Sequence, residues 1–289
     1  MWMVLSSVLM MSSSAHRKPI EMYTEIGVIP IQAHRGGGIA LPENTLETFE
    51  MTWKNRMIPE ADIRTTSDHV IVCMHDAVID RIAPGAPEKL KKVPFEELDL
   101  TTVKSLDVGA YRGMPGQKIP TLREVFEAMK GRRDRMVYLD YKRIDMDRLA
   151  RLVKEYGLEK QVIFTTNHHD LIVQWKKQIP ESPTMIWIGG SLDNIKQTMA
   201  DLRETDFDGL TTLQIHVKLD ERGEFIPGVS FLKEAMTEVE RHGILFQVLP
   251  WRIDEAKVYE DLMEIGVRSF ATDYMDMTLE VYKRFMEER

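Results

Sequence analysis

The chain has 289 residues and a mass of 33.5 kDa, so its length is close to the roughly 250 residues of a (β/α)8 barrel. Apolar residues make up 43% and charged residues 29% of the sequence, a balance that is typical of globular proteins and excludes a disordered chain. The net charge of −8 repels the backbone of a nucleic acid, and no long run of lysine and arginine offsets it. We therefore expect one large globular domain with no nucleic-acid partner.

The first 27 residues precede the first predicted strand, and we expect them to form an amino-terminal extension. Residues 1–19 read MWMVLSSVLMMSSSAHRKP, in which a short apolar stretch is followed by small residues ending at Ala15. This pattern faintly resembles an export signal but has no basic beginning, and a disordered or extended segment is the alternative. The stretch is too short to span a bilayer and no other segment approaches that length, so we expect no stable membrane insertion. The compartment and the oligomeric state stay open.

From residue 28 onward, short β-like runs alternate with helical patterns, which predicts a parallel α/β architecture. The candidate strands, eight in number, lie at 28–34, 59–65, 136–142, 162–166, 184–189, 208–212, 244–249 and 268–273. Capping boxes that start helices are predicted at Asn44-x-x-Glu47 and Thr121-x-x-Glu124. We interpret residues 28–289 as a single domain.

One further strand, 69–75, interrupts the alternation because it follows the second strand after only the residues SDH. Parallel strands need a crossover of about a dozen residues, so this turn permits only an antiparallel hairpin off the second strand. Residues 76–120 then form a long insertion that is rich in proline, glycine and charge. Such loops often cover a site at the top of a barrel. The one cysteine, Cys73, lies in the apolar run VIVCMHD and is expected to be a buried apolar residue.

His34 and Arg35 end the first predicted strand, just before three glycines. A barrel places its active site at the carboxyl ends of its strands, so this is a candidate catalytic position. The alternative is a turn histidine with a satisfied hydrogen bond. His75 ends the hairpin arm in the same way. Two imidazoles can serve as one acid and one base near neutral pH.

Glu60 and Asp62 stand two residues apart in the second predicted strand, so their side chains point to the same face. If that face is the barrel interior, the two carboxylates repel each other unless they share a hard divalent cation such as Ca²⁺ or Mg²⁺. Periodicity alone favours the opposite arrangement, in which both are solvated and Ala61 and Ile63 face inward.

Asp140 and Lys142 repeat the two-residue spacing at the end of the next predicted strand, in YLDYK. Asp140 is a third candidate metal ligand, and Lys142 is a candidate for binding an anion. A structural ion pair between the two is the alternative.

Several ordered stretches together resemble the glycerophosphodiester phosphodiesterase family. They are AHRGG with PENT, EADIRTT, HD followed by IDR, SLDVG, IPTLREVF, YLDYK, Trp251 and IGVRSFATDYMD, and they run from about residue 31 to 276. The resemblance implies a (β/α)8 TIM barrel with a β-hairpin insertion after the second barrel strand. It also implies metal-dependent hydrolysis of a small-molecule phosphodiester to an alcohol and glycerol 3-phosphate.

The resemblance also implies a role for each matching residue. His34 and His75 would be the catalytic acid/base pair. Arg35 and Lys142 would bind the phosphate, and Trp251 would form a wall for the substrate. A divalent ion, Ca²⁺ or Mg²⁺, would be held by Glu60, Asp62 and Asp140, with Glu43 of PENT as a polar neighbour supporting the metal site.

The sequence departs from the family pattern at three positions. Asp140 stands where a glutamate is usual, Arg252 where a small polar residue is common, and Met275 where a proline is frequent. A lysophospholipase D activity is an alternative function within the same family, and it requires an apolar lip on the insertion 76–120. A non-catalytic phosphodiester-binding module is a second alternative, although such a module has no need of two histidines.

Overall fold

The computed structural model describes residues 20–288. The possible export signal in residues 1–19 lies outside this range. Within the described residues, no helix has the length and apolar character needed to cross a membrane.

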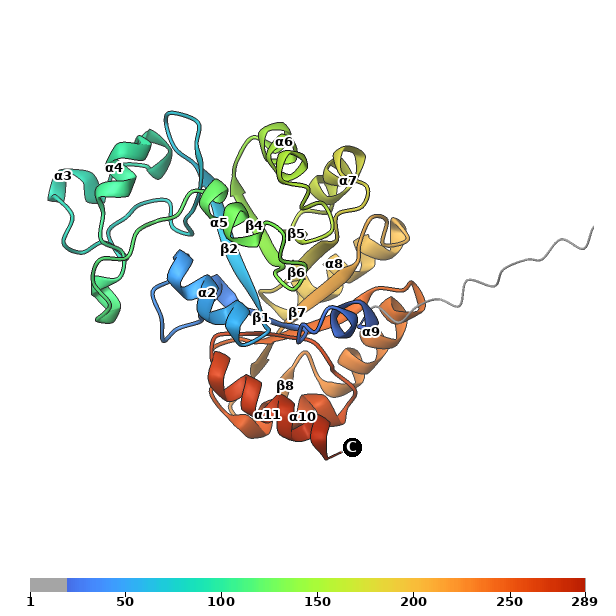
Figure 1. Ribbon diagram of the computed structural model, residues 1–289. Coiled ribbons are helices and arrows are strands. Elements are labelled where there is room, and N and C mark those ends of the chain that lie inside the picture. The colour runs from blue at the N-terminus through green and yellow to red at the C-terminus, as the bar shows by residue number, and fades with distance from the viewer. Residues whose placement is uncertain (1–19, 289) are drawn as a thin grey trace, which may run out of the picture.

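Eight parallel strands in the described part of the chain close into a barrel, as expected, with helices between successive strands (Figure 1). In spatial order the barrel runs β1, β10, β9, β7, β6, β5, β4 and β2, and the pairing of β1 with β2 closes it. Their bounds are β1 Ile31–Ala33, β2 Ile58–Thr65, β4 Val137–Arg143, β5 Val162–Thr166, β6 Thr184–Ile188, β7 Thr212–Leu219, β9 Leu245–Pro250 and β10 Phe270–Thr272.

The sixth barrel strand was predicted at 208–212, and that prediction is wrong. Strand β7 begins only at Thr212 and continues to Leu219. The residues before it form the turn that ends the preceding helix, in which Asp206, Phe207 and Gly209 have left-handed φ angles of 52°, 55° and 76°. A β-strand cannot contain these conformations, so the strand starts after the turn. The correction matters because β7 sends side chains into the barrel mouth.

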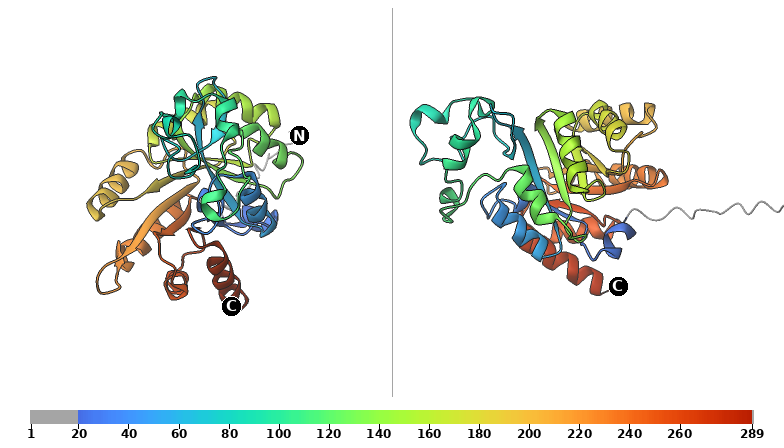
Figure 2. Two further views of the ribbon diagram at one scale, coloured as in Figure 1. Left: turned by 90° about the vertical axis from the view of Figure 1, so that its left-hand side faces the viewer. Right: turned by 45° about the horizontal axis from the view of Figure 1, so that its top comes forward.

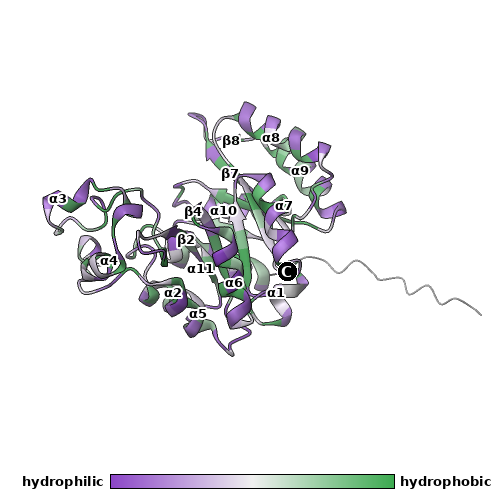
Figure 3. Cartoon of the chain, turned by 90° about the horizontal axis from the view of Figure 1, so that it is seen from above, coloured by the Kyte–Doolittle hydropathy of each residue, from purple (hydrophilic) through white to green (hydrophobic). Residues whose placement is uncertain are grey.

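Helices surround the barrel and bury their apolar faces against it, as the hydropathy colouring shows (Figure 3). The barrel helices are α2 Leu46–Lys54, α5 Leu122–Met129, α6 Met146–Tyr156, α7 His169–Gln178, α8 Leu192–Glu204, α9 Val229–Arg241, α10 Ala256–Glu264 and α11 Met275–Glu287. The capping box predicted at Thr121 and Glu124 is confirmed. The one predicted at Asn44 is wrong, because Thr45 caps α2 while the Asn44 amide binds the backbone N–H and the carboxylate of Asp62.

Strand β3 (Ile71–Cys73) pairs antiparallel with the end of β2, as the short turn before it requires. Residues 76–120 follow, and their short helices α3 (Glu88–Lys91) and α4 (Leu100–Ser105) project from one side of the barrel (Figures 1 and 2). This insertion packs around a hydrophobic cluster of its own, with Phe95 at its centre and fully buried. It is therefore a folded element and not only a loop.

The described part of the amino-terminal extension contains a short helix, α1 (Glu21–Glu25), whereas the disordered or extended segment expected for residues 1–19 lies outside the described residues. Tyr23 of this helix is buried with Ile58, Tyr138 and Met185 in a cluster separate from the main core. These residues lie near the amino ends of the barrel strands, so α1 covers the end of the barrel opposite the candidate site.

The glycines after His34 let the chain turn tightly against two neighbouring elements. Gly36 has a left-handed φ of 87°, and a Cβ there would collide with the ring of Phe49 in α2. Gly38 has a φ of 66°, and a Cβ there would collide with the backbone carbonyl of Asp273, the residue after β10. The backbone of the same turn also bonds to this carbonyl, from the N–H of Ile39 at 2.9 Å.

We expect Gly38→Ala to destabilise the fold far more than Gly131→Ala. Both glycines are left-handed, with φ of 66° and 72°, but a Cβ at Gly131 would meet nothing within 4 Å. The shared conformation costs about 1–2 kcal/mol in each variant, and the collision with Asp273 adds roughly 1–3 kcal/mol to Gly38→Ala alone. Urea unfolding of both variants measures the difference. Equal losses would show that the close approach to Asp273 carries no energy.

Candidate active site

The predicted site residues lie together at the carboxyl ends of the barrel strands. His34 and Arg35 follow β1, His75 follows β3, and Trp251 follows β9. Glu60 and Asp62 lie in β2, and Asp140 and Lys142 lie in the neighbouring strand β4. Helices and strands far apart in the sequence thus converge on one mouth.

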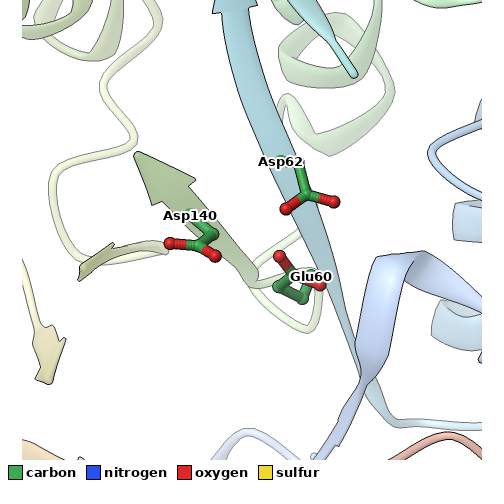
Figure 4. A group of neighbouring side chains, drawn as sticks. All are labelled: Glu60, Asp62 and Asp140. Carbon is green, nitrogen blue, oxygen red and sulfur yellow. The ribbon is translucent and has the colours of Figure 1, made fainter. Parts of the chain in front are cut away.

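Glu60, Asp62 and Asp140 form a buried acidic cluster (Figure 4). Each contributes an oxygen, these atoms lie within 4.8 Å of one another, and the residues are 2%, 1% and 8% exposed. The arrangement favoured by periodicity, with Glu60 and Asp62 solvated, is wrong. Both faces of β2 are covered, because Ala61 and Ile63 pack in the core under the helices while the carboxylates face the barrel mouth. Alternation along a strand does not distinguish two buried faces.

The three carboxylates of this cluster do not ionise with equal ease. Burial and the nearby charge of Asp62 raise the pKa of Glu60 to about 8. Burial also opposes ionisation of Asp62, but the charges of Lys142 and Arg35 and the hydrogen bond from Asn44 outweigh it and lower the Asp62 pKa. The Glu60 oxygen Oε1 is buried and has no hydrogen-bond partner among the described residues, while Oε2 accepts the backbone N–H of Arg35 at 2.5 Å.

Lys142 lies between two of the carboxylates. Its ammonium is 2.7 Å from Oδ2 of Asp140 and 3.0 Å from Oδ1 of Asp62. Burial lowers the pKa of Lys142, but the charges of Asp62 and Asp140 outweigh burial and raise it, so the ammonium stays charged. The ion pair considered for Asp140 and Lys142 is therefore present, and Lys142 lines the cavity as well.

His34 is held by Asp273, a residue that the sequence analysis did not select. Nδ1 of His34 lies 2.7 Å from Oδ1 of Asp273. Burial alone would lower the pKa of His34, but this hydrogen bond and the charge of Glu60 outweigh burial and raise it. Asp273 was recognisable as a carboxylate directly after the last strand, the position that barrels use for site residues.

His75 has hydrogen-bond partners on both ring nitrogens. Its Nδ1 lies 2.7 Å from Oδ1 of Asp76, and the Arg35 guanidinium donates to its Nε2 at 3.0 Å. Arginine is always a donor, so Nε2 carries a lone pair and the proton is on Nδ1. The nitrogen of His75 that accepts this hydrogen bond therefore faces Arg35.

Glu43 contacts two arginines near His75, Arg81 and Arg35. Its carboxylate accepts two hydrogen bonds from Arg81, at 2.6 and 2.7 Å, and lies 3.3 Å from Nη1 of Arg35. Arg81, which the sequence analysis did not select as a site residue, also binds Asp76 at 2.7 Å. Glu43 thus lies beside the guanidinium of Arg35, whose backbone N–H binds Glu60.

Three aromatic side chains form one wall of the mouth. The ring of His216 in β7 is stacked between Trp187 and Trp251, with centroid distances of 5.3 and 5.2 Å and interplanar angles of 8° and 16°. Trp251 was expected to be a wall. His216 was missed because the sixth strand was predicted to end before it. Trp187 was missed because its sequence neighbourhood indicated only an apolar strand and no site residue.

Two adjoining cavities open at the mouth. The first, of about 320 Å³, extends from the acidic cluster to the aromatic wall and contains both catalytic candidates His34 and His75. The second, of about 360 Å³, shares His34, Arg35 and Trp251 with the first and contains Arg252. Met275, another departure from the family pattern, is a buried residue at the start of α11.

The chain is similar in sequence to known phosphodiesterases. The model of the glycerophosphoryl diester phosphodiesterase family matches residues 34–277. A glycerophosphodiester phosphodiesterase of Caldanaerobacter subterraneus subsp. tengcongensis is 26% identical over 251 residues, which cover 83% of this chain and 92% of that protein. The mouse lysophospholipase D GDPD1 is 26% identical over 267 residues, covering 84% and 82%.

Solved structures show the same fold. A phosphodiesterase of Oleispira antarctica, solved in complex with the product sn-glycerol-3-phosphate, superposes with a TM-score of 0.70 at 19% identity. The match covers 91% of this chain and 99% of that one.

We expect His216 to stay neutral throughout the physiological pH range. Burial between the tryptophans, and the nearby His34 and Lys218, lower its pKa to about 4. A histidine-resolved NMR titration measures this value. Trp187→Ala should expose the ring to water and raise its pKa toward 6.5, and an ordinary value in the unaltered protein would contradict the stacked arrangement.

Proposed function

This chain belongs to the glycerophosphoryl diester phosphodiesterase family, and we propose that it hydrolyses glycerophosphodiesters to an alcohol and glycerol 3-phosphate by two-histidine acid/base catalysis at a divalent metal site. The observation that carries the proposal is that His34 and His75 line one cavity together with Arg35, beside the acidic cluster. A phosphodiester held there has a proton donor and a proton acceptor within one cavity.

The residues of the acidic cluster fit a hard divalent cation, Ca²⁺ or Mg²⁺. Such ions prefer carboxylate oxygens, and the unpartnered Oε1 of Glu60 is a ligand atom with no other use among the described residues. Glu60, Asp62 and Asp140 would hold the ion. When bound, it would polarise the phosphoryl oxygens and neutralise the charge that forms on them.

Arg35 and Lys142 would bind the phosphodiester oxygens beside the cluster. Both are fixed by neighbouring carboxylates, so they need little rearrangement to meet the anion. Trp251 would form the wall against the substrate.

The hydrogen bonds suggest which histidine acts first as the base. His75 has its unprotonated Nε2 toward Arg35 and would take the proton from the glycerol 2-hydroxyl as that oxygen attacks phosphorus. His34, whose pKa is raised by Asp273 and Glu60, would give its proton to the oxygen of the leaving alcohol. The products of this step are the free alcohol and a cyclic phosphate.

The second step would use the same two groups in reversed roles. His34, now neutral, takes a proton from water as the water oxygen attacks phosphorus. His75 returns its proton to the 2-oxygen as the ring opens, which gives glycerol 3-phosphate. Each histidine finishes in its starting protonation state, so the cycle is balanced.

A lysophospholipase D activity is the second candidate, favoured by the name of the mouse relative. It requires an apolar surface near the mouth to hold an acyl chain. Residues 76–120, which the structure describes in full, carry no exposed large apolar side chain, because most of their apolar residues are buried in the cluster that contains Phe95 or are partly buried against it. The insertion therefore favours the water-soluble diester.

We expect Ca²⁺ or Mg²⁺ to raise the melting temperature, and a chelator to lower it and abolish activity. An ion that binds only the folded state stabilises it by about 2.7 kcal/mol at one hundred times its Kd. Differential scanning fluorimetry with and without the ion measures the shift. Asp62→Asn should lose the shift, whereas Asp134→Asn, at an exposed carboxylate outside the mouth, should keep it. Activity that survives exhaustive chelation would contradict the metal site.

We expect His34→Ala and His75→Ala each to lower kcat by roughly 10²–10⁴-fold on a natural diester. A 4-nitrophenyl ester of glycerol phosphate separates their roles, because 4-nitrophenolate leaves without being protonated. On that ester His34→Ala should regain most of its activity, while His75→Ala should not. His242→Ala, at an exposed histidine after α9, is the control and should behave as the unaltered protein. The reverse pattern would exchange the two assignments, and full activity in either variant would remove that histidine from the mechanism.

A further inference from the structure

The second cavity beside His34 is lined by an excess of cationic side chains. Arg81, Arg112 and Arg252 line it together with Arg35, which it shares with the first cavity. Arg112 comes from the insertion 76–120, whereas Arg252 follows β9 on the opposite side of the mouth. The cavity thus brings positive charge together from segments about 140 residues apart.

The acidic residues of the same cavity already have partners. Glu43 and Asp76 both bind Arg81, and Asp273 binds His34. The ion pairs of these three carboxylates do not include Arg112 or Arg252, and the backbone N–H of Arg252 donates to Oδ2 of Asp273 at 3.4 Å. Both side chains are exposed, and their guanidinium groups lie over the neighbouring rings of Tyr111 and Trp251, at 5.1 and 5.7 Å from the ring centroids. The tyrosine hydroxyl accepts the backbone N–H of Glu43, which ties this part of the insertion to the mouth.

The position of the cavity relative to the histidines indicates which part of a substrate it faces. His34 lines both cavities, but His75 lines only the first. If His34 protonates the leaving alcohol, the alcohol lies on the His34 side of phosphorus, in the second cavity, and glycerol lies on the His75 side.

We propose that the second cavity binds an anionic group on the leaving alcohol through Arg112 and Arg252. This inference rests on the proposed function. The substrate class is then a glycerophosphodiester whose alcohol carries a further phosphate, since a guanidinium group matches phosphate oxygens in geometry and charge. A volume of about 360 Å³ lies within the range of small-molecule sites. In a chain with a net charge of −8, long-range electrostatics alone would disfavour such a substrate, so a preference for it requires a local site.

A matched pair of substrates tests the proposal: glycerophosphoinositol 4-phosphate and glycerophosphoinositol, which differ only in the second phosphate. We expect kcat/KM to be roughly tenfold higher for the phosphorylated ester at low ionic strength, with the preference falling as salt is added. In the double variant Arg112→Gln/Arg252→Gln the ratio of the two kcat/KM values should fall to about one. An equal ratio in the unaltered protein and the double variant would overturn the proposal.

The control is Arg148→Gln/Arg151→Gln, which changes the net charge by the same amount at two exposed arginines of α6, outside the mouth. It should keep the preference. If it loses the preference as the double variant does, the effect is one of net charge and the local site is refuted.

Binding of inositol 4-phosphate, measured by calorimetry, separates this inference from the proposed function. If neither diester is hydrolysed, the proposed function fails. The cavity is then still supported if the unaltered protein binds this ligand at least tenfold more tightly than the double variant, and it is overturned if the two bind alike or neither binds.

Discussion

The site depends on the tight turn that follows β1. Arg35 adopts a left-handed conformation, with φ of 53° and ψ of 28°, and its backbone N–H bonds to Glu60 while its guanidinium contacts Glu43 and His75. Such a conformation is costly for a residue with a side chain, and it persists only where surrounding contacts stabilise it. The glycine at 38 lets the same turn lie against the backbone of Asp273, whose carboxylate holds His34. One turn therefore positions both histidines and one of the carboxylates.

The electrostatics of the mouth follow from the burial of like charges. Three carboxylates face one another with one ammonium, that of Lys142, between two of them. If all three carboxylates were ionised, this one ammonium would not neutralise their charge. The raised pKa of Glu60 is the consequence in the protein alone, and a divalent cation is the chemical alternative to protonation. The short side chain of Asp140, where the family usually has a glutamate, lies close enough to bind Lys142 and still belongs to the cluster.

The insertion 76–120 and the residue after Trp251 supply positive charge to the second cavity. The insertion buries its apolar residues in its own core, and from that base it places Tyr111 and Arg112 at the mouth. Arg252 reaches the same cavity from the other side. The fold is that of the family, and the arginines around the second cavity come from the insertion and from the segment after β9.

The sequence by itself determined the barrel and most of the site, because strand and helix periods are local and because ordered motifs mark the strand ends. The number of barrel strands and the antiparallel arm follow from the residues, and the resemblance to the family adds the convergence of His34, His75 and the three carboxylates. Tertiary structure alone decided which face of β2 is the mouth, since both faces are buried and periodicity cannot tell them apart. It also decided the partners that come from distant segments, such as Asp273 for His34 and Arg81 for Glu43. Local signals misplaced β7, and with it His216, because the left-handed turn after the preceding helix continues to Gly209, inside the predicted strand, and the strand therefore begins and ends later along the chain.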